Sequence, residues 1–192
     1  MTTFDPAGYG PIFAALLKEP RLMPLDPGTP DSGVKPALEA LDLVRAFAPH
    51  DIADPNMAEA CRSAVWLYHD YIAVSHTISQ QIDTATGSYW HGIMHRREPD
   101  YPNSKYWFRR VGDHPILPAL HQAASEIAAN SSVLPDSARF LVTQSGWDPV
   151  AFIDLCEAAH GGRAPAEDLC RTIQQREWEL LFDYSYRQAT GG

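Results

Sequence analysis

The chain has 192 residues, 45% of them hydrophobic, which suits one globular domain with a sizeable core. Its formal net charge of −9 argues against general nucleic-acid binding, which requires a basic face. Because it shows no membrane-length apolar run, no signal-type N-terminus and no CxxC motif, we expect a reduced, cytoplasmic protein with no membrane partner. The sequence does not predict an oligomeric state.

The first 36 residues hold seven of the sixteen prolines. Gly10-Pro11 predicts the start of a short helix that ends before Pro20. Residues 20–36 are too proline-rich for a regular helix, and we expect an extended arm anchored by Leu22, Met23 and Leu25. The predicted organisation is an arm over residues 1–36, packed on a single helical domain over 37–192.

Helical spacing of apolar residues, with proline starts and glycine ends, predicts the remaining elements. No segment shows sustained strand alternation or a hairpin signal. The predicted fold is therefore all-α, a single-domain helical bundle of about seven or eight helices with a Pro-rich N-terminal arm. The expected helices cover 36–47, 56–81, 89–97, 102–111, 115–130, 136–143, 149–159 and 165–188.

Residues 87–115 have an unusual composition, with three histidines, two tryptophans and four arginines. On a helix over 89–98, His91, His95 and Glu98 follow at i, i+4 and i+7 and share one face. A divalent metal such as Zn, Mn or Fe accepts this ligand set. The pattern differs from the HExxH zinc-protease motif because residue 92 is glycine, which also indicates a close approach by another group.

The preceding helix carries His69, Asp70 and His76 near the edge of its apolar face. A short connection favours antiparallel packing of the two helices, which would bring His69 or His76 to His91 and His95. We expect these four histidines to be the metal ligands, and Glu98, Asp70 and His95 to be the acid–base groups. The alternative is that each histidine is a satisfied hydrogen-bonding partner at a helix edge.

A net charge of +2 over residues 91–114 predicts a small anionic ligand. Arginine forks bind carboxylate or phosphate, and a helix start adds N–H donors. The alternatives are that the basic side chains pair with acids, that the arginines ending the helix complement its dipole, and that tryptophan is core. The expected substrate-binding residues are Arg96, Arg97, Arg110, Lys105, Trp90 and Asn103.

Three segments carry a resemblance: 75–80 (SHTISQ), 87–100 (GSYWHGIMHRREPD) and 105–112 (KYWFRRVG). They resemble a family of small helical bacterial proteins of uncharacterised activity, and the likeness extends to EWELLFD at 177–183. The resemblance implies no activity, cofactor or substrate.

Two functional hypotheses of different classes follow. The first is a small-molecule enzyme or ligand-binding protein with a His/Glu/Arg centre, of hydrolase or lyase type and dependent on a divalent metal. The second is a tetratricopeptide-like helical interaction module, suggested by 98–110 although no second copy of the repeat is present. It predicts that Arg97 and Arg110 face an open groove and that the histidines do not converge. A purely structural polar network is a third possibility.

Overall fold

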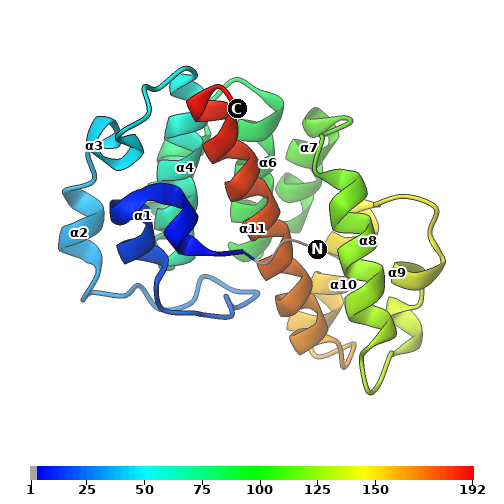
Figure 1. Ribbon diagram of the computed structural model, residues 1–192. Helices are drawn as coiled ribbons and strands as arrows, with labels where there is room; N and C mark the ends of the chain where they lie inside the picture. Colours follow the sequence, from blue (N-terminus) through cyan, green and yellow to red (C-terminus); the bar gives the residue numbers. More distant parts are fainter. Residues whose placement is uncertain (1–3) are drawn as a thin grey trace.

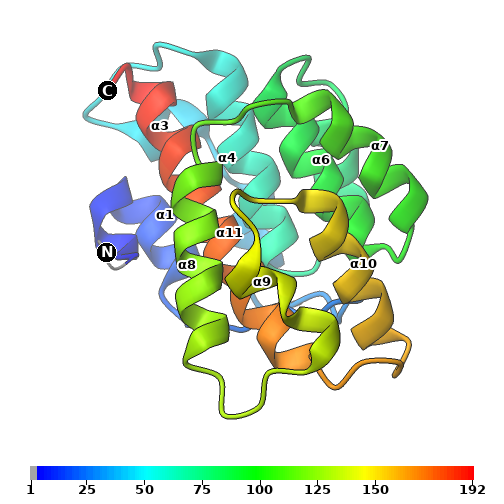
Figure 2. The same cartoon turned by 90° about the vertical axis from the view of Figure 1, so that its right-hand side faces the viewer.

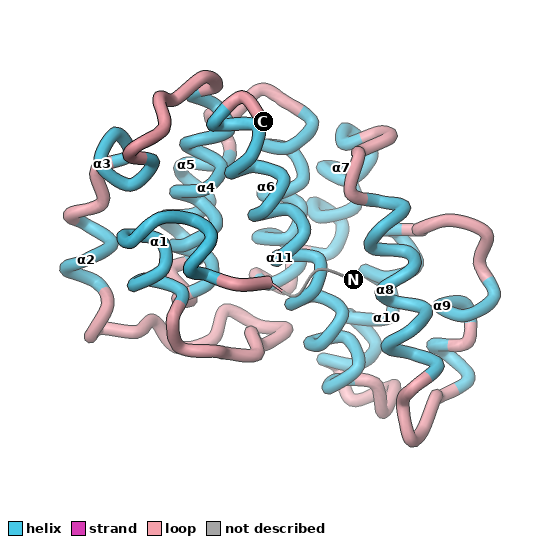
Figure 3. The backbone as a smooth tube through the Cα atoms, in the orientation of Figure 1, coloured by secondary structure: helices cyan, strands magenta, loops and turns pink. Residues whose placement is uncertain are grey.

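The computed structural model describes residues 4–192, and every regular element in that part of the chain is helical (Figure 3). The all-α prediction is confirmed, with eleven α-helices in the described residues instead of seven or eight. They are joined by two 3₁₀ segments, η1 (Pro6–Tyr9) and η2 (Asp136–Ala138). The α-helices are α1 (Gly10–Leu17), α2 (Lys35–Glu39), α3 (Leu43–Phe47), α4 (Pro55–Tyr68), α5 (Ile72–Ser79), α6 (Ala85–Arg97), α7 (Tyr101–Val111), α8 (Leu117–Ala129), α9 (Phe140–Thr143), α10 (Pro149–His160) and α11 (Glu167–Thr190).

The long C-terminal helix α11 runs through the middle of the molecule, with α4 and α6 on one side and α8 and α10 on the other (Figures 1 and 2). The larger apolar core joins the N-terminal helices to α4, α6 and α11, around Phe13, Phe47 and Trp178. A smaller core, which includes Leu120 and Phe152, lies between α8, α10 and α11. No helix among the described residues is both long and apolar enough to cross a membrane.

The N-terminal segment packs on these helices. Met23 and Leu25 are buried, as predicted, and each packs in one of the two apolar cores. The Met23 and Pro24 carbonyls accept hydrogen bonds from Arg171 and Gln174 of α11, which hold the segment against that helix. The predicted anchor Leu22 is 39% exposed, so it is not an anchor. Residues 1–3 of the predicted arm lie outside the described residues.

The single helix predicted over 56–81 is wrong, because α4 and α5 are separate. Asp70 has a φ of 66°, in the left-handed region that terminates helices, and the Tyr71 N–H donates to the Trp66 carbonyl at 3.0 Å. Aspartate tolerates this conformation better than most residues. The break redirects the chain, so residues 72–79 lean on α6.

Two further boundaries differ from those predicted. Asp42 caps α3 by accepting from the Arg45 N–H at 3.0 Å, which divides the predicted helix 36–47 into two. Helix α6 begins at Ala85, four residues before the predicted start, because Thr84 caps it by accepting from the Gly87 N–H at 3.0 Å. A Cβ at Gly87 would lie 2.1 Å from the Ile82 carbonyl oxygen, so the first turn of α6 requires glycine.

Helices α6 and α7 form the close pair on which the site is built. The Ser104 hydroxyl donates to the Gly92 carbonyl at 2.8 Å, and a Cβ at Gly92 would lie 2.8 Å from the Phe108 ring. The close approach expected at Gly92 is therefore present. It brings the first turns of α7 directly over His91 and His95.

Candidate metal centre

Three imidazoles converge where α5 meets α6. His76 comes from α5, and His91 and His95 come from successive turns of α6. One potential ligand nitrogen from each ring lies within 4.8 Å of the other two. The rings of His91 and His95 are buried, whereas His76 is half-buried and leaves the cluster open on one side.

The hydrogen bonds of His91 determine which nitrogen is free. The Ser79 hydroxyl donates to the His76 carbonyl at 3.3 Å, so it accepts from His91 Nδ1–H at 2.8 Å. The lone pair of His91 then lies on Nε2. A histidine whose second nitrogen is held in this way is pre-oriented as a metal ligand.

His95 is held by carboxylates. Its Nδ1 lies 3.0 Å from Glu98 Oε2 and 3.9 Å from Asp100 Oδ2. Because an ionised carboxylate only accepts, Nδ1 carries the proton and Nε2 the lone pair. The Asn103 side-chain amide lies 3.0 Å from that Nε2 and donates to it. Asn103, half-buried in the first turn of α7, would turn aside when a cation occupies this position.

Both buried imidazoles are neutral at neutral pH, which is the form that binds metals. Burial, reinforced by the neighbouring imidazoles of His95 and His76, lowers the pKa of His91 to about 3. Burial also lowers the pKa of His95, although the adjacent Glu98 carboxylate opposes that shift.

The outer side of the cluster is covered by α7. The Trp107 ring lies against His91, with ring centroids 4.3 Å apart, and the Arg110 guanidinium lies 5.3 Å from the Trp107 ring centroid. Arg110 is therefore separated from the histidines by one side chain. Glu98 and Asp100, each nearly half exposed, lie just beyond the C-terminal end of α6 and border the site beside His95.

Two of the predicted site residues, His69 and Asp70, lie elsewhere. His69 Nε2 hydrogen bonds to the Leu16 carbonyl at 2.8 Å, so this ring packs against α1 and not against His91. Asp70 is buried and forms ion pairs with Arg21 and Arg97. The helix break places both residues away from the imidazole cluster.

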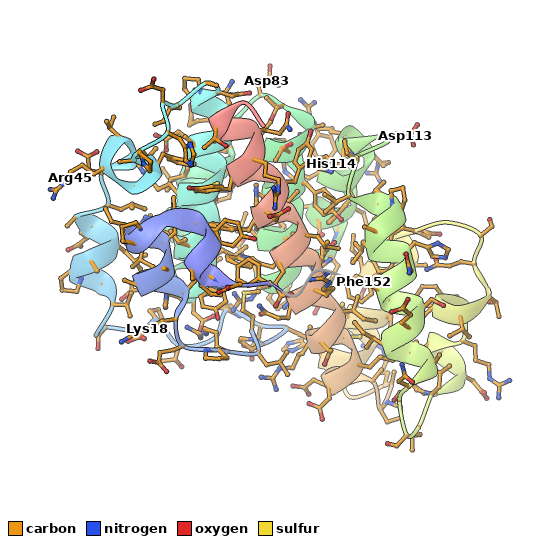
Figure 4. All side chains as sticks on the ribbon, in the orientation of Figure 1. Lys18, Arg45, Asp83, Asp113, His114 and Phe152 are labelled. Atoms are coloured by element: carbon orange, nitrogen blue, oxygen red, sulfur yellow. The ribbon has the colours of Figure 1, made fainter. Side chains whose placement is uncertain are left out.

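The two arginines that end α6 are also directed away from the cluster. Arg96 is 1% exposed, forms an ion pair with Glu177 of α11 and packs between the rings of Phe108 and Phe152. Figure 4 shows Phe152 in the interior beside α11. Arg97 is fully buried and donates to the Leu67 carbonyl at 2.8 Å. Both guanidiniums are occupied by internal partners, so the structure does not present them to a substrate.

The remaining predicted substrate-binding residues divide between the core and the surface. Trp90 is fully buried and its indole N–H donates to Ser185 of α11 at 3.2 Å. Lys105 forms an ion pair with Asp154 of α10. Only Asn103 and Arg110 lie beside the imidazole cluster.

Several surface hollows of the protein lie away from the imidazole cluster. Five well-formed surface hollows in the described part of the chain are lined by other residues, one of them by His69 and another by His114. His76 and Asn103 are half-buried while His91 and His95 are buried, so a ligand reaches the ring nitrogens from the side of His76 and Asn103.

Sequence reasoning missed two supporting residues of this site. Ser79, which orients His91, stands three positions after His76 in a helix whose separate direction the sequence does not reveal. Trp107, which was not among the predicted site residues, is half-buried against His91. A polar residue one turn after a candidate ligand is the signal that would have identified Ser79.

Comparison with known proteins finds no relative of this chain. No protein-family model matches the chain, and neither a curated protein nor a solved structure is similar to it. The resemblance to a bacterial family therefore stays a prediction.

Proposed function

We propose that His76, His91 and His95 bind a divalent metal ion, zinc in the first instance, and that the protein is a metal-dependent hydrolase. The observation that carries this proposal is the convergence of three imidazoles, two of which have Nδ1 hydrogen bonded to a neighbouring side chain. The Nε2 atom of His91 is free, and that of His95 is contacted by the Asn103 amide, which a metal ion would displace. A histidine with a purely structural role requires a hydrogen-bond partner for its ring. Packing alone does not require three imidazoles to converge.

Three neutral histidine ligands determine the chemistry that a bound zinc ion would provide. A tetrahedral zinc ion with Zn–N distances of about 2.0–2.1 Å requires ligand nitrogens about 3.4 Å apart, so the rings would close slightly on binding. His76 has the freedom for this because it is half-buried. Three histidine ligands leave a fourth position for a water molecule whose pKa falls to about 7. Glu98, which orients His95, is a carboxylate beside the site that could accept a proton.

The interaction-module hypothesis has less support. It predicted that Arg97 and Arg110 would face an open groove and that the histidines would not converge. Arg110 is 46% exposed, but the other two expectations fail. Arg97 is fully buried, and the rings of His91 and His95 lie 4.6 Å apart at their centroids.

Metal analysis of protein purified without a histidine tag tests the proposal. We expect one equivalent of zinc to bind the wild-type chain, and the affinity to fall at least about 100-fold in His76→Ala, His91→Ala and His95→Ala. His160→Ala is the matched control because His160 is exposed at the end of α10. Sub-stoichiometric binding by folded wild-type protein would leave only a packing role for the cluster.

Ser79, which holds His91 Nδ1, provides an independent measurement. Ser79→Ala removes the acceptor of His91 Nδ1–H, and we expect zinc affinity to fall about 10- to 100-fold while the fold is retained. Thr77→Ala, on the same helix, is the control because the Thr77 hydroxyl bonds only within α5. Zinc-dependent hydrolysis of activated esters should decline in the same order as affinity. Equal affinities in the two variants would show that Ser79 does not orient a ligand.

A further inference from the structure

One face of α7 continues the proposed metal centre outward. Asn103, Trp107 and Arg110 follow at i, i+4 and i+7, so their side chains lie along one stripe. Asn103 contacts His95, Trp107 contacts His91, and Arg110 lies over the outer face of Trp107. These three side chains therefore form a continuous line from the histidine cluster to the Arg110 guanidinium.

Arg110 is a basic side chain near the cluster that stays accessible to a ligand. Its side chain is 46% exposed, and its ion pair with Asp83 spans 3.7 Å. Asp83 is 99% exposed and projects from the edge of the molecule (Figure 4). An ion pair of this kind contributes about 0–1 kcal/mol, so another anion can replace Asp83.

The distance between Asn103 and Arg110 along α7 sets the length of a ligand that spans them. Arg110 lies seven residues beyond Asn103, a rise of about 10 Å along the helix. Between the two lie the half-buried Trp107 ring and the adjacent Tyr106 ring, which is 47% exposed. This intermediate surface is aromatic, which favours an apolar segment over a polar one.

We infer that the substrate is an apolar chain that ends in a carboxylate, bound by Arg110, about 10 Å from the group held at the three histidines. The inference rests on the proposed metal centre and adds the substrate class. A carboxylate fits because Arg110 already pairs with the single carboxylate of Asp83, and the guanidinium fork matches that geometry. A dianionic phosphate would require a second cation to offset repulsion by Asp83.

Linear dicarboxylates test the inference without knowledge of the natural substrate. One carboxylate binds the metal and the other reaches Arg110 only if the chain is long enough. Calorimetric titration of the zinc-loaded protein with acetate, succinate and suberate, which has six methylene groups between its carboxylates, measures this dependence. We expect suberate to bind about five- to tenfold more tightly than acetate or succinate.

The variant Arg110→Gln should abolish this preference for suberate and leave zinc affinity unchanged. Arg109→Gln, on the next position of α7 and about 100° away around the helix, should retain it. If zinc binds stoichiometrically but suberate and acetate bind equally, or if Arg110→Gln keeps the preference, the substrate inference is wrong and the metal centre stands. If no zinc binds to the folded wild-type chain, the proposed function fails and the inference fails with it.

Discussion

The buried histidines of this protein use their two nitrogens in different ways. His91 and His95 each have Nδ1 held by a neighbouring side chain, and both rings meet His76 in one cluster. In His114 both nitrogens are occupied, Nε2 by Thr86 at 3.1 Å and Nδ1 by the Ile116 N–H at 3.4 Å. The same residue type is thus a candidate ligand where its ring meets two other imidazoles, and a packing group where it lies between tyrosine rings.

His114 gives a pH prediction at the residue scale. Burial lowers its pKa from about 6.5 in the unfolded chain to about 4 in the folded one. The group packed around it, Thr86, Tyr89 and Tyr184, contains no carboxylate that would offset the shift. A depressed folded-state pKa gives stability that is complete above about pH 6.5 and is lost as the pH falls toward 4.

The variant His114→Gln isolates this contribution. We expect the loss of melting temperature between pH 7 and pH 5 to be about 3–6 °C smaller in the variant than in the wild type. Thermal melts at several pH values measure it, and His50→Gln, an exposed histidine, is the control. Parallel pH profiles for wild type and His114→Gln would contradict the assignment.

At the scale of elements, the site depends on how two helix boundaries are fixed. The break between α4 and α5 gives His76 a direction of its own, and Asp70 at that break is paired with Arg97 from the end of α6. The same buried carboxylate also accepts from Arg21 of the N-terminal segment. One aspartate therefore fixes a helix end, a neighbouring helix and the extended segment that crosses them.

Asp70→Asn tests this role. Asparagine retains the tolerance for positive φ but removes the charge, which leaves the buried Arg97 guanidinium without its counter-ion. We expect the free energy of unfolding to fall by about 3–5 kcal/mol in chemical denaturation. Asp83→Asn, at a fully exposed aspartate, should change it by no more than about 0.5 kcal/mol. Similar values for both variants would refute the role of Asp70.

The contact of α6 with α7 gives a second prediction at this scale. Gly92→Ala would place a methyl group 2.8 Å from the Phe108 ring. The intrinsic gain of about 1 kcal/mol in helix propensity is outweighed if Phe108 must shift, and we expect a net loss of about 1–3 kcal/mol. Gly8→Ala is the control, because nothing lies within 4 Å of that Cβ position. A stabilised Gly92→Ala protein would show that the two helices are not in close contact.

At the scale of the whole molecule, α11 lies between two apolar cores and contributes side chains to both. Leu180 of α11 packs against both, and the N-terminal helices complete the larger one through Phe13, Leu16 and Leu17. The described residues before 37 are therefore a structural part of the domain, because Phe13, Leu16 and Leu17 belong to its larger core.

The N-terminal segment can be tested by graded changes. Deletion of residues 1–36 should abolish the cooperative thermal transition because it uncovers the larger core. Phe13→Ala should cost about 3–5 kcal/mol, whereas Leu22→Ala, at a 39% exposed residue, should cost little. A cooperative melt of the 37–192 fragment would show that the domain folds without the arm.

Local patterns predicted several features well. Proline starts and aspartate caps located α7 and α10, because a cap is a contact between residues two or three positions apart. The histidine spacing on α6 placed His91 and His95 on one face. The break at Asp70 was not predicted, because no glycine or proline marks it and its cause is a charge pairing with distant residues.

The sequence alone determined the all-α class, most helix starts and the shared face of His91 and His95, since each depends on neighbours along the chain. Only the tertiary structure decided that His76 joins them and His69 does not, and that Arg96 and Arg97 are internal while Arg110 stays accessible. The physical reason is that helical periodicity fixes which side chains share a face, whereas burial and ion pairing depend on which other helix covers that face.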